Sequence, residues 1–343
     1  METLGHRRFT EFCDACRRYA YIGLCFGAPG VGKTLSARSY SRWDKFKQSS
    51  RWGAESFELP PLDTIFYTPS VINTPGNITT ELDRFRRTLW DLARRPLRLE
   101  QEKKLEAIQR RDDAHRAELL YTHDWLESPF PELQPTYGEV AREYIARDAE
   151  VRDPTTLIVI DEADRLRMAS LEQIRSIFDA GEVGVILIGM PGLEKRLARY
   201  PQFYSRIGFV HEFRPLGAAE TRQLLERQWT PPGVRLPARS MDQETIAAII
   251  RITNGNFRLL NRMLTQIERI LEINVLDEVT KAVVEAARES LVIGEANGSY
   301  VEFRIMLSQG PRDRNGEAPI RFCLHGTLHN HRASRNAKSS PQV

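Results

Sequence analysis

The sequence predicts an α/β fold with a five-stranded parallel sheet, followed by an all-helical domain and a disordered tail. Five short apolar runs separated by helix-compatible segments predict the sheet. After residue 216 only helical spacing remains, which predicts the second domain. The expected division is 1–216 for the α/β domain, with a charged helical insertion near 79–135, then 217–296 for the helical domain and 297–343 for the tail.

The elements of the first domain follow in order along the chain. An amphipathic helix comes first, because Phe9, Phe12, Cys13 and Cys16 recur at helical intervals. The expected strands are 21–26, 64–67, 157–160, 183–188 and 207–213. The expected helices are 33–46, one or two helices over 79–125 with a break near Pro96, 137–149, 166–180 and 193–200.

Four helices are expected in the second domain, at 219–228, 242–253, 257–273 and 280–290. Beyond residue 297 apolar periodicity almost disappears, and Arg, Asn, Ser, His and Gly dominate from 310 to 343. This composition is typical of a disordered tail. Contact between its basic residues and nucleic acid is the alternative.

A glycine-rich motif lies between the first apolar run and the following helix. It has the form G-x-x-x-x-G-K-[ST] and consists of Gly27, Ala28, Pro29, Gly30, Val31, Gly32, Lys33 and Thr34. In this strand–loop–helix context backbone N–H groups surround a triphosphate, the lysine reaches the outer phosphates and the threonine hydroxyl holds Mg²⁺. The motif therefore predicts binding of ATP or GTP; a glycine-rich turn without a ligand is the alternative.

Two carboxylates follow the third apolar run. Asp161 and Glu162 come directly after residues 157–160, and ligands of parallel sheets lie beyond the carboxyl ends of the strands. We expect Asp161 to share the Mg²⁺ shell with Thr34, and Glu162 to polarise the attacking water. A solvated helix cap is the alternative for this pair.

Charge and hydropathy limit the classes of protein to which this chain can belong. The 343 residues carry a net charge of +3 with the two signs interspersed, so nucleic-acid binding is permitted but not favoured. No apolar stretch approaches the roughly 20 residues of a membrane span. Residues 1–9 are polar rather than a secretory leader. We therefore expect a cytoplasmic protein without a membrane partner.

The four cysteines, Cys13, Cys16, Cys25 and Cys323, are too scattered for a disulfide framework. The spacing of Cys13 and Cys16 allows a redox or zinc site, with Cys323, His325, His329 and His331 as further ligands. We expect the first two cysteines instead to pack an amphipathic helix. The charge-rich segment 79–125 is expected to be a solvated face, with a surface for DNA or a protein partner as the alternative.

The phosphate loop, the acidic pair and a helical domain after the α/β core together resemble the AAA+ ATPases. The resemblance implies the P-loop sheet of the ASCE class and a helical lid. Arg206, in Y-S-R-I before the fifth strand, resembles the arginine finger that completes a neighbouring subunit's ATP site. Arg258, in N-G-N-F-R, resembles the second sensor, which contacts the outer phosphates from the lid. A helix cap or a surface ion pair is the alternative for both.

Within AAA+, the segments 159–166 and 188–190 and Arg206 resemble the transposon-encoded ATPases of the TniB and TnsC type, with more distant similarity to the phage Mu B protein and origin-recognition ATPases. This implies ATP-loaded homo-oligomers that assemble on duplex DNA without reading bases and present it to a transposase. Hydrolysis would dismantle the assembly. Candidates for phosphate contacts are Lys45, Lys47, Arg84, Arg86 and Arg87, with solvated charge as the alternative.

One position departs from that family. Met190 occupies the end of the fourth strand, where these ATPases present a polar first sensor. Either another group positions the water, or hydrolysis is slow and ATP binding matters more than turnover. Two other functions remain open: a nucleotide-gated scaffold ATPase that acts on protein partners without DNA, and a small-molecule phosphotransferase. The acidic pair and the helical lid argue against the phosphotransferase.

Overall fold

We describe the protein from a computed structural model. The structure describes residues 3–45, 47, 62–122, 134–181, 183–237, 241–291, 304–309 and 320–325. The chain divides into two compact units, Met1–Ala287 and Arg288–Val343. The predicted boundary between residues 216 and 217 falls inside the first unit, where strands give way to helices, and as a domain boundary it stays a prediction.

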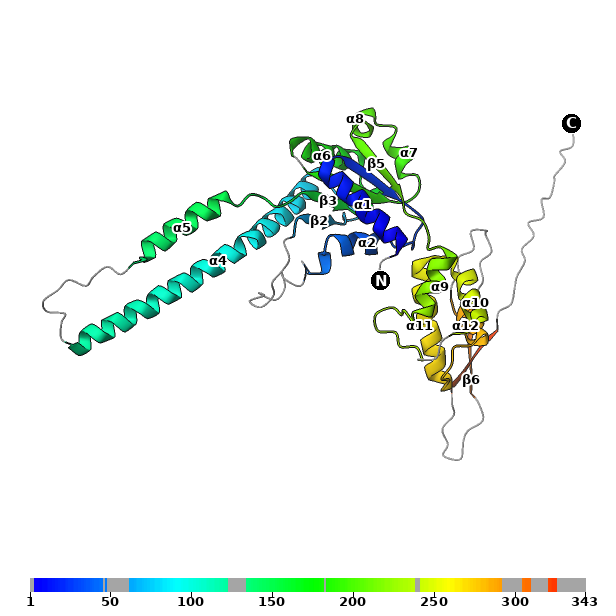
Figure 1. The fold of residues 1–343 in the computed structure, drawn as a ribbon. Coiled ribbons are helices and arrows are strands. Elements are labelled where there is room, and N and C mark those ends of the chain that lie inside the picture. The colour runs from blue at the N-terminus through cyan, green and yellow to red at the C-terminus, as the bar shows by residue number, and fades with distance from the viewer. Residues whose placement is uncertain are drawn as a thin grey trace. The chain divides into compact units, whose positions relative to one another are not determined.

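The first unit contains a five-stranded parallel sheet, as predicted (Figure 1). Its strands are β1 (Ile22–Phe26), β2 (Thr64–Tyr67), β3 (Leu157–Ile160), β4 (Gly184–Gly189) and β5 (Ile207–Glu212). They lie in the order β2-β3-β4-β1-β5, and every neighbouring pair is parallel. Because β4 lies between β1 and β3, the glycine-rich loop after β1 and the acidic pair after β3 meet across the end of β4.

Helices α1 (Leu4–Tyr19) and α2 (Lys33–Tyr40) cover one face of the sheet (Figure 1). Phe9, Phe12, Cys13 and Cys16 are all buried on the inner side of α1, which confirms the predicted amphipathic helix. The helix lies so close to β1 that a Cβ on Gly23 would be 2.3 Å from the Cys16 Sγ. The cysteines therefore serve packing, as expected from their spacing.

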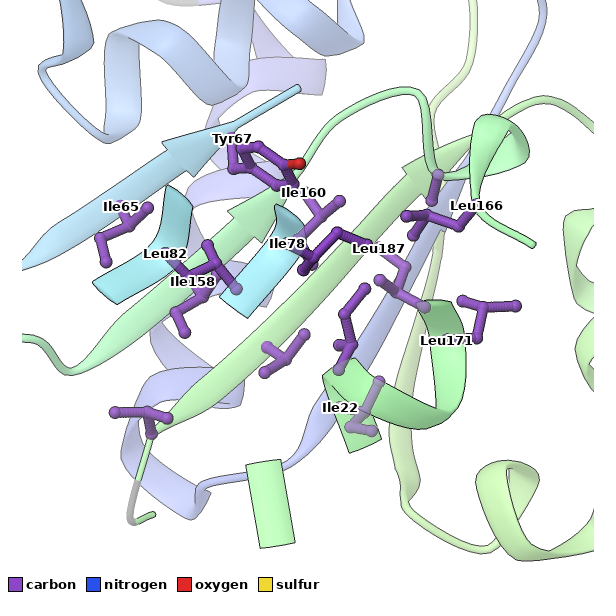
Figure 2. Close-up of a cluster of buried hydrophobic side chains, with 14 of the residues drawn as sticks. Ile22, Ile65, Tyr67, Ile78, Leu82, Ile158, Ile160, Leu166, Leu171 and Leu187 are labelled. Carbon is purple, nitrogen blue, oxygen red and sulfur yellow. The ribbon is translucent and has the colours of Figure 1, made fainter. Parts of the chain in front are cut away.

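The opposite face packs against the beginning of α4 (Pro75–Thr122) and against α6 (Met168–Ala180). Figure 2 shows Ile78 and Leu82 of α4 and Leu171 of α6 over side chains from the strands, among them Ile158 and Leu187. The strands are thus buried on both faces, which explains why their sequences read as continuous apolar runs rather than as an alternation.

Two predicted helices differ in extent from the observed ones. The helix expected to run from Lys33 to Phe46 ends at Tyr40, because Arg42 adopts a left-handed conformation with φ of 52°. Phe46 lies outside the described residues. The helix expected at 193–200 is two short ones, α7 (Leu193–Leu197) and α8 (Pro201–Tyr204). Pro201 begins the second, where a missing N–H costs nothing.

The predicted charged insertion near 79–135 is occupied mainly by α4, which is followed by α5 (Tyr137–Glu150). The two helices lie side by side (Figure 1). The break expected at Pro96 is absent, and α4 continues through it. Ion pairs with α5 occur on both sides of the proline, from Arg94 to Asp148 at 3.3 Å and from Glu100 to Arg147 at 2.8 Å. We attribute the continuity to this packing, because it opposes the cost of an interior proline, about 3 kcal/mol.

Helices replace strands after residue 217, as predicted. They are α9 (Ala218–Glu226), α10 (Gln243–Thr253), α11 (Phe257–Asn274) and α12 (Lys281–Glu289). Their inner faces are apolar, with Ile249, Leu264 and Val284 fully buried. In the second unit β6 (Arg304–Gln309) and β7 (Ile320–His325) pair antiparallel. The predicted disordered tail otherwise falls outside the described residues. No helix in the described ranges combines the length and apolarity needed to cross a bilayer.

Candidate nucleotide site

The glycine-rich loop connects β1 to α2 as the motif predicts. Gly30 and Gly32 have φ of 82° and 110°, a backbone region that other residues rarely adopt. Gly27 has a different reason to be glycine, because an added Cβ would lie 2.2 Å from the carbonyl oxygen of Phe213. The loop is thereby shaped to direct its backbone N–H groups and the amino end of α2 into the space above it, which favours an anion.

Lys33 begins α2, and its side chain folds back over the loop. Its Nζ donates to the carbonyl oxygens of Gly27 at 2.6 Å and Ala28 at 2.9 Å. Burial lowers the pKa of Lys33, while the carboxylates of Asp161 and Asp164 oppose that shift. The ammonium group therefore lies beside the loop with two uncharged carbonyl partners, and a phosphate would be a stronger acceptor for it.

Asp161 lies directly beyond β3 and is 3% exposed. Its backbone N–H donates to the Tyr67 carbonyl oxygen at 2.8 Å, and its Oδ1 accepts from the Glu162 backbone at 2.9 Å. Burial raises the pKa of Asp161, against the lowering effect of a hydrogen bond with the Thr34 side chain. The structure thus brings together the two side chains predicted to hold Mg²⁺, and both present the oxygen ligands that this cation prefers.

Glu162 projects from a strained position beside Asp161. Its φ is 51° and its ψ is 43°, the left-handed region. Its carboxylate forms an ion pair with Arg165, whose Nη1 also donates to the Pro69 carbonyl oxygen at 3.1 Å. Glu162 lines the cavity above the loop, but in this conformation its carboxylate is engaged by an arginine.

A cavity of about 540 Å³ lies over the glycine-rich loop. The predicted residues that line it are Pro29, Gly30, Gly32, Lys33, Thr34, Asp161, Glu162 and Arg258. Met190 also lines it and is 40% exposed. The sequence did not single out Asp164, Arg165, Phe257 or Asn261, which complete the lining with Leu35, Arg38 and Gly189.

The beginning of α11 is fastened to the loop. Asn256 donates from Nδ2 to the Pro29 carbonyl oxygen at 3.0 Å, and the Arg258 backbone N–H donates to the Gly30 carbonyl oxygen at 2.9 Å. Arg258 also contributes to the lowered pKa of Lys33. Arg258 therefore lies beside the glycine-rich loop and lines the cavity, and its role as a second sensor stays a prediction.

Arg206 does not line this cavity. Its guanidinium makes two hydrogen bonds to Asp179, at 2.6 Å from Nε and 2.9 Å from Nη2, on the exposed surface where α6 and the start of β5 meet. Arg206 thus forms the surface ion pair that the sequence analysis gave as an alternative to the arginine finger. Its role in a neighbouring subunit stays a prediction.

A second cavity, of about 710 Å³, adjoins the first and shares Gly32, Leu35 and Phe257 with it. Phe213, Trp229 and Phe257 give it aromatic walls, and the Trp229 and Phe257 rings lie 5.2 Å apart. These residues are distant in sequence and follow no motif, so the sequence carried no signal for this cavity.

Among the predicted DNA contacts, Arg86 is taken up by an ion pair with Asp153 at 2.7 Å. Lys47 and Arg84 line one cavity with Trp43, and the Lys47 Nζ lies 5.6 Å from the Trp43 ring centroid. Lys45 and Arg87 are exposed.

The cysteines in the described part of the first unit, Cys13, Cys16 and Cys25, are buried free thiols. Burial raises the pKa of Cys16 to about 12, which makes it a poor metal ligand. Among residues with described side chains, no group of three His, Cys, Asp or Glu is arranged to hold a metal ion. Cys323 and His325 lie in β7, whose side chains are not described, and His329 and His331 fall outside the described residues.

Comparisons with known proteins agree with this site. A family model described as an AAA domain matches residues 16–197, more than half of the chain. A Staphylococcus aureus protein named as a potential ATP-binding protein is 41% identical over 297 residues, which are 86% of this chain and 97% of that protein.

Two solved structures are more distantly similar. The Aeropyrum pernix ORC1 protein in complex with DNA has 19% identity and a TM-score of 0.45, with 83% of this chain and 64% of that chain covered. The Thermotoga maritima RuvB Holliday junction branch migration motor has 13% identity and a TM-score of 0.48, with 86% and 71% covered. This chain thus spans less than two thirds of the ORC1 chain.

Proposed function

The chain belongs to the AAA domain family of P-loop ATPases, and we propose that it is a DNA-dependent, ATP-driven oligomeric switch that delivers target DNA to a transposase. Its nucleotide-binding ATPase core is common to the family. The observation that carries the proposal for this chain is the 540 Å³ cavity, in which Lys33, Thr34, Asp161, Glu162 and Arg258 converge.

Within this cavity we propose that Lys33 and Arg258 bind the outer phosphates of ATP. Thr34 and Asp161 would hold Mg²⁺, which when bound neutralises charge on the phosphates. Glu162 would accept the proton of the attacking water. The ion pair with Arg165 must open for that step, so the conformation described here suits binding better than turnover.

For the nucleoside we propose the adjoining 710 Å³ cavity. Aromatic and apolar walls from Phe213, Trp229 and Phe257 favour a flat heterocycle. The cavity continues from the first one past Gly32 and Leu35. A nucleotide with its phosphates over the glycine-rich loop therefore has space for its base on the side of α11.

We propose that Arg206 acts in a neighbouring subunit of a homo-oligomer. It is partly exposed and does not line its own chain's cavity, which fits a residue that completes another copy's site. On assembly the guanidinium would have to leave Asp179 and bind a phosphate instead. Arginine suits this exchange, because its guanidinium can form two parallel hydrogen bonds with either a carboxylate or a phosphate.

The DNA part of the proposal rests on the resemblance to transposon-encoded ATPases. Arg84, which lines a cavity with Trp43, is a better candidate for a phosphate contact than Arg86, which Asp153 neutralises. Contacts of this kind do not read bases, so affinity should fall steeply as salt rises.

The test is the steady-state ATPase rate at low salt with and without duplex DNA, with Lys33→Ala as the blank. We expect hydrolysis above the blank and stimulation by DNA. Equal rates with and without DNA, together with no DNA binding in the presence of an unhydrolysed ATP analogue, would exclude the DNA-dependent switch.

A second candidate is a nucleotide-gated scaffold ATPase that binds proteins. The arm formed by α4 and α5 favours it, because charges there neutralise one another: Lys104 bridges Glu100 and Glu143, and Arg147 contacts the same two carboxylates. At these four residues the two positive and two negative charges cancel, so this part of the arm offers DNA no net positive charge. ATP-driven oligomerisation without DNA binding would support this function.

A further inference from the structure

A carboxylate that the sequence did not assign lies at the end of β4, beside Met190. The Met190 backbone N–H donates to the Asp164 Oδ2 at 2.7 Å. The contact depends on Gly189, because an added Cβ there would lie 2.6 Å from that same oxygen. Asp164 thus occupies the space that a side chain at the end of the strand would take.

The main chain of Asp164 is held from a second direction. Arg196 of α7 donates from Nη1 to the Asp164 carbonyl oxygen at 3.0 Å and from Nη2 to the carbonyl oxygen of Leu166. The turn after β3 is therefore fastened to the helix after β4. Such double anchoring fixes where the carboxylate points.

The carboxylate faces the nucleotide cavity. Asp164 lines that cavity together with Lys33, Thr34 and Glu162, and its charge acts on the Lys33 ammonium. Oδ2 is used by Met190, while Oδ1 makes no hydrogen bond to any residue in the described ranges. One oxygen is thus committed to the strand end and the other is available to a molecule in the cavity.

We propose that Asp164 positions the attacking water: its Oδ1 accepts a hydrogen bond from that water and supplies the polar contact that Met190 cannot make. This rests on the proposed function, since it requires ATP hydrolysis in this cavity. The water oxygen bonds to the γ-phosphorus, the bond from that phosphorus to the β–γ bridging oxygen breaks with its electron pair leaving on ADP, and the proton of the water passes to Glu162.

Asp164→Asn separates this role from a structural one. The amide oxygen still accepts from the Met190 N–H, so the strand end keeps its partner. The other oxygen becomes an NH₂ group, which donates instead of accepting and carries no charge. A residue needed only to hold the strand end tolerates this change, whereas a water-positioning residue does not.

The experiment compares the full-length parent, Asp164→Asn and a matched control, Glu194→Gln. Glu194 also accepts from a backbone N–H, that of Gly192 at 2.9 Å, but does not line the cavity. We expect Asp164→Asn to lower kcat about 10²-fold, with the affinity for an unhydrolysed ATP analogue and the melting temperature unchanged. The control should hydrolyse ATP at the parental rate.

Adding Met190→Asn to Asp164→Asn places an amide beside the same water and should restore the rate about tenfold. Parental kcat in Asp164→Asn overturns the proposal. Lost analogue binding or a lower melting temperature in that variant also overturns it, because the role is then structural. If the parent hydrolyses ATP no faster than the Lys33→Ala blank, the proposed function is refuted together with the role of Asp164. If the parent and Asp164→Asn are equally active, only the role of Asp164 is refuted.

Discussion

The fastening of α11 to the glycine-rich loop can be tested through Asn256. This side chain does two things at once. Its Oδ1 accepts from the Leu259 backbone N–H at 3.1 Å and so caps the helix, while its Nδ2 donates to the Pro29 carbonyl oxygen at 3.0 Å. Asn256→Ala removes both interactions. Asn256→Ser keeps a capping oxygen but is too short to reach Pro29, so the pair of variants separates the cap from the bridge.

The magnitudes follow from these two contacts. Loss of an N-cap costs about 1 kcal/mol. The bridge is exposed to water, so we assign it about 0.5–1 kcal/mol, the lower part of the range for a hydrogen bond. Asn256→Ala should therefore lower the free energy of unfolding by about 1.5–2 kcal/mol, and Asn256→Ser by about 0.5–1 kcal/mol.

Urea unfolding of the nucleotide-free protein measures this difference, and titration with a fluorescent ATP analogue measures its effect on the site. Because the bridge holds the start of α11 beside Gly30, where Arg258 N–H also binds, its loss should weaken analogue binding about twofold to fivefold in both variants. Parental stability of Asn256→Ser would refute the contribution of the bridge, equal stability of Asn256→Ser and Asn256→Ala would refute that of the cap, and parental affinity in both variants would refute the link between the bridge and the nucleotide.

Three further outcomes are expected. Glu162→Gln should bind an ATP analogue as the parent does but not turn ATP over, and hydrolysis at the parental rate would show that another group accepts the proton. Arg206→Ala should impair hydrolysis only at concentrations where subunits assemble, and mixing it with Glu162→Gln should restore part of the rate. A parental rate in the assembled Arg206→Ala variant would refute the arginine-finger role. Because burial raises the pKa of Asp161, ionisation is disfavoured in the folded state and stability falls as pH rises through that pKa. Asp161→Asn should therefore raise the nucleotide-free melting temperature more at neutral than at acid pH, and an equal shift at every pH would contradict this.

The parts of the site that a local motif encodes could be predicted from sequence. Lys33 and Thr34 follow a strand and begin a helix, and Asp161 follows another strand, so the parallel sheet alone brings them together. The strands could also be predicted from sequence, because burial on both faces leaves uninterrupted apolar runs such as 157–160.

The rest depends on contacts between residues far apart in the chain. Asn256 meets Pro29 across 227 positions, and Asp164 finds Met190 only because β3 and β4 are neighbours. Periodicity cannot reveal such pairs. Pro96 failed as a signal for the same reason, since the packing of α5 outweighs a local preference that would otherwise break the helix.

That unbroken helix has a mechanical consequence. At 1.5 Å per residue the 48 residues of α4 span about 72 Å. Its first turns pack against the sheet's core through Ile78 and Leu82, and within the described residues its far part contacts α5 and residues 134–135. A rigid rod held at one end magnifies rotation: each degree of tilt where Ile78 meets the sheet displaces the tip by about 1.3 Å over that length. A tilt of a few degrees at the sheet, close to the nucleotide site, would thus move the far end of α4 by several ångströms.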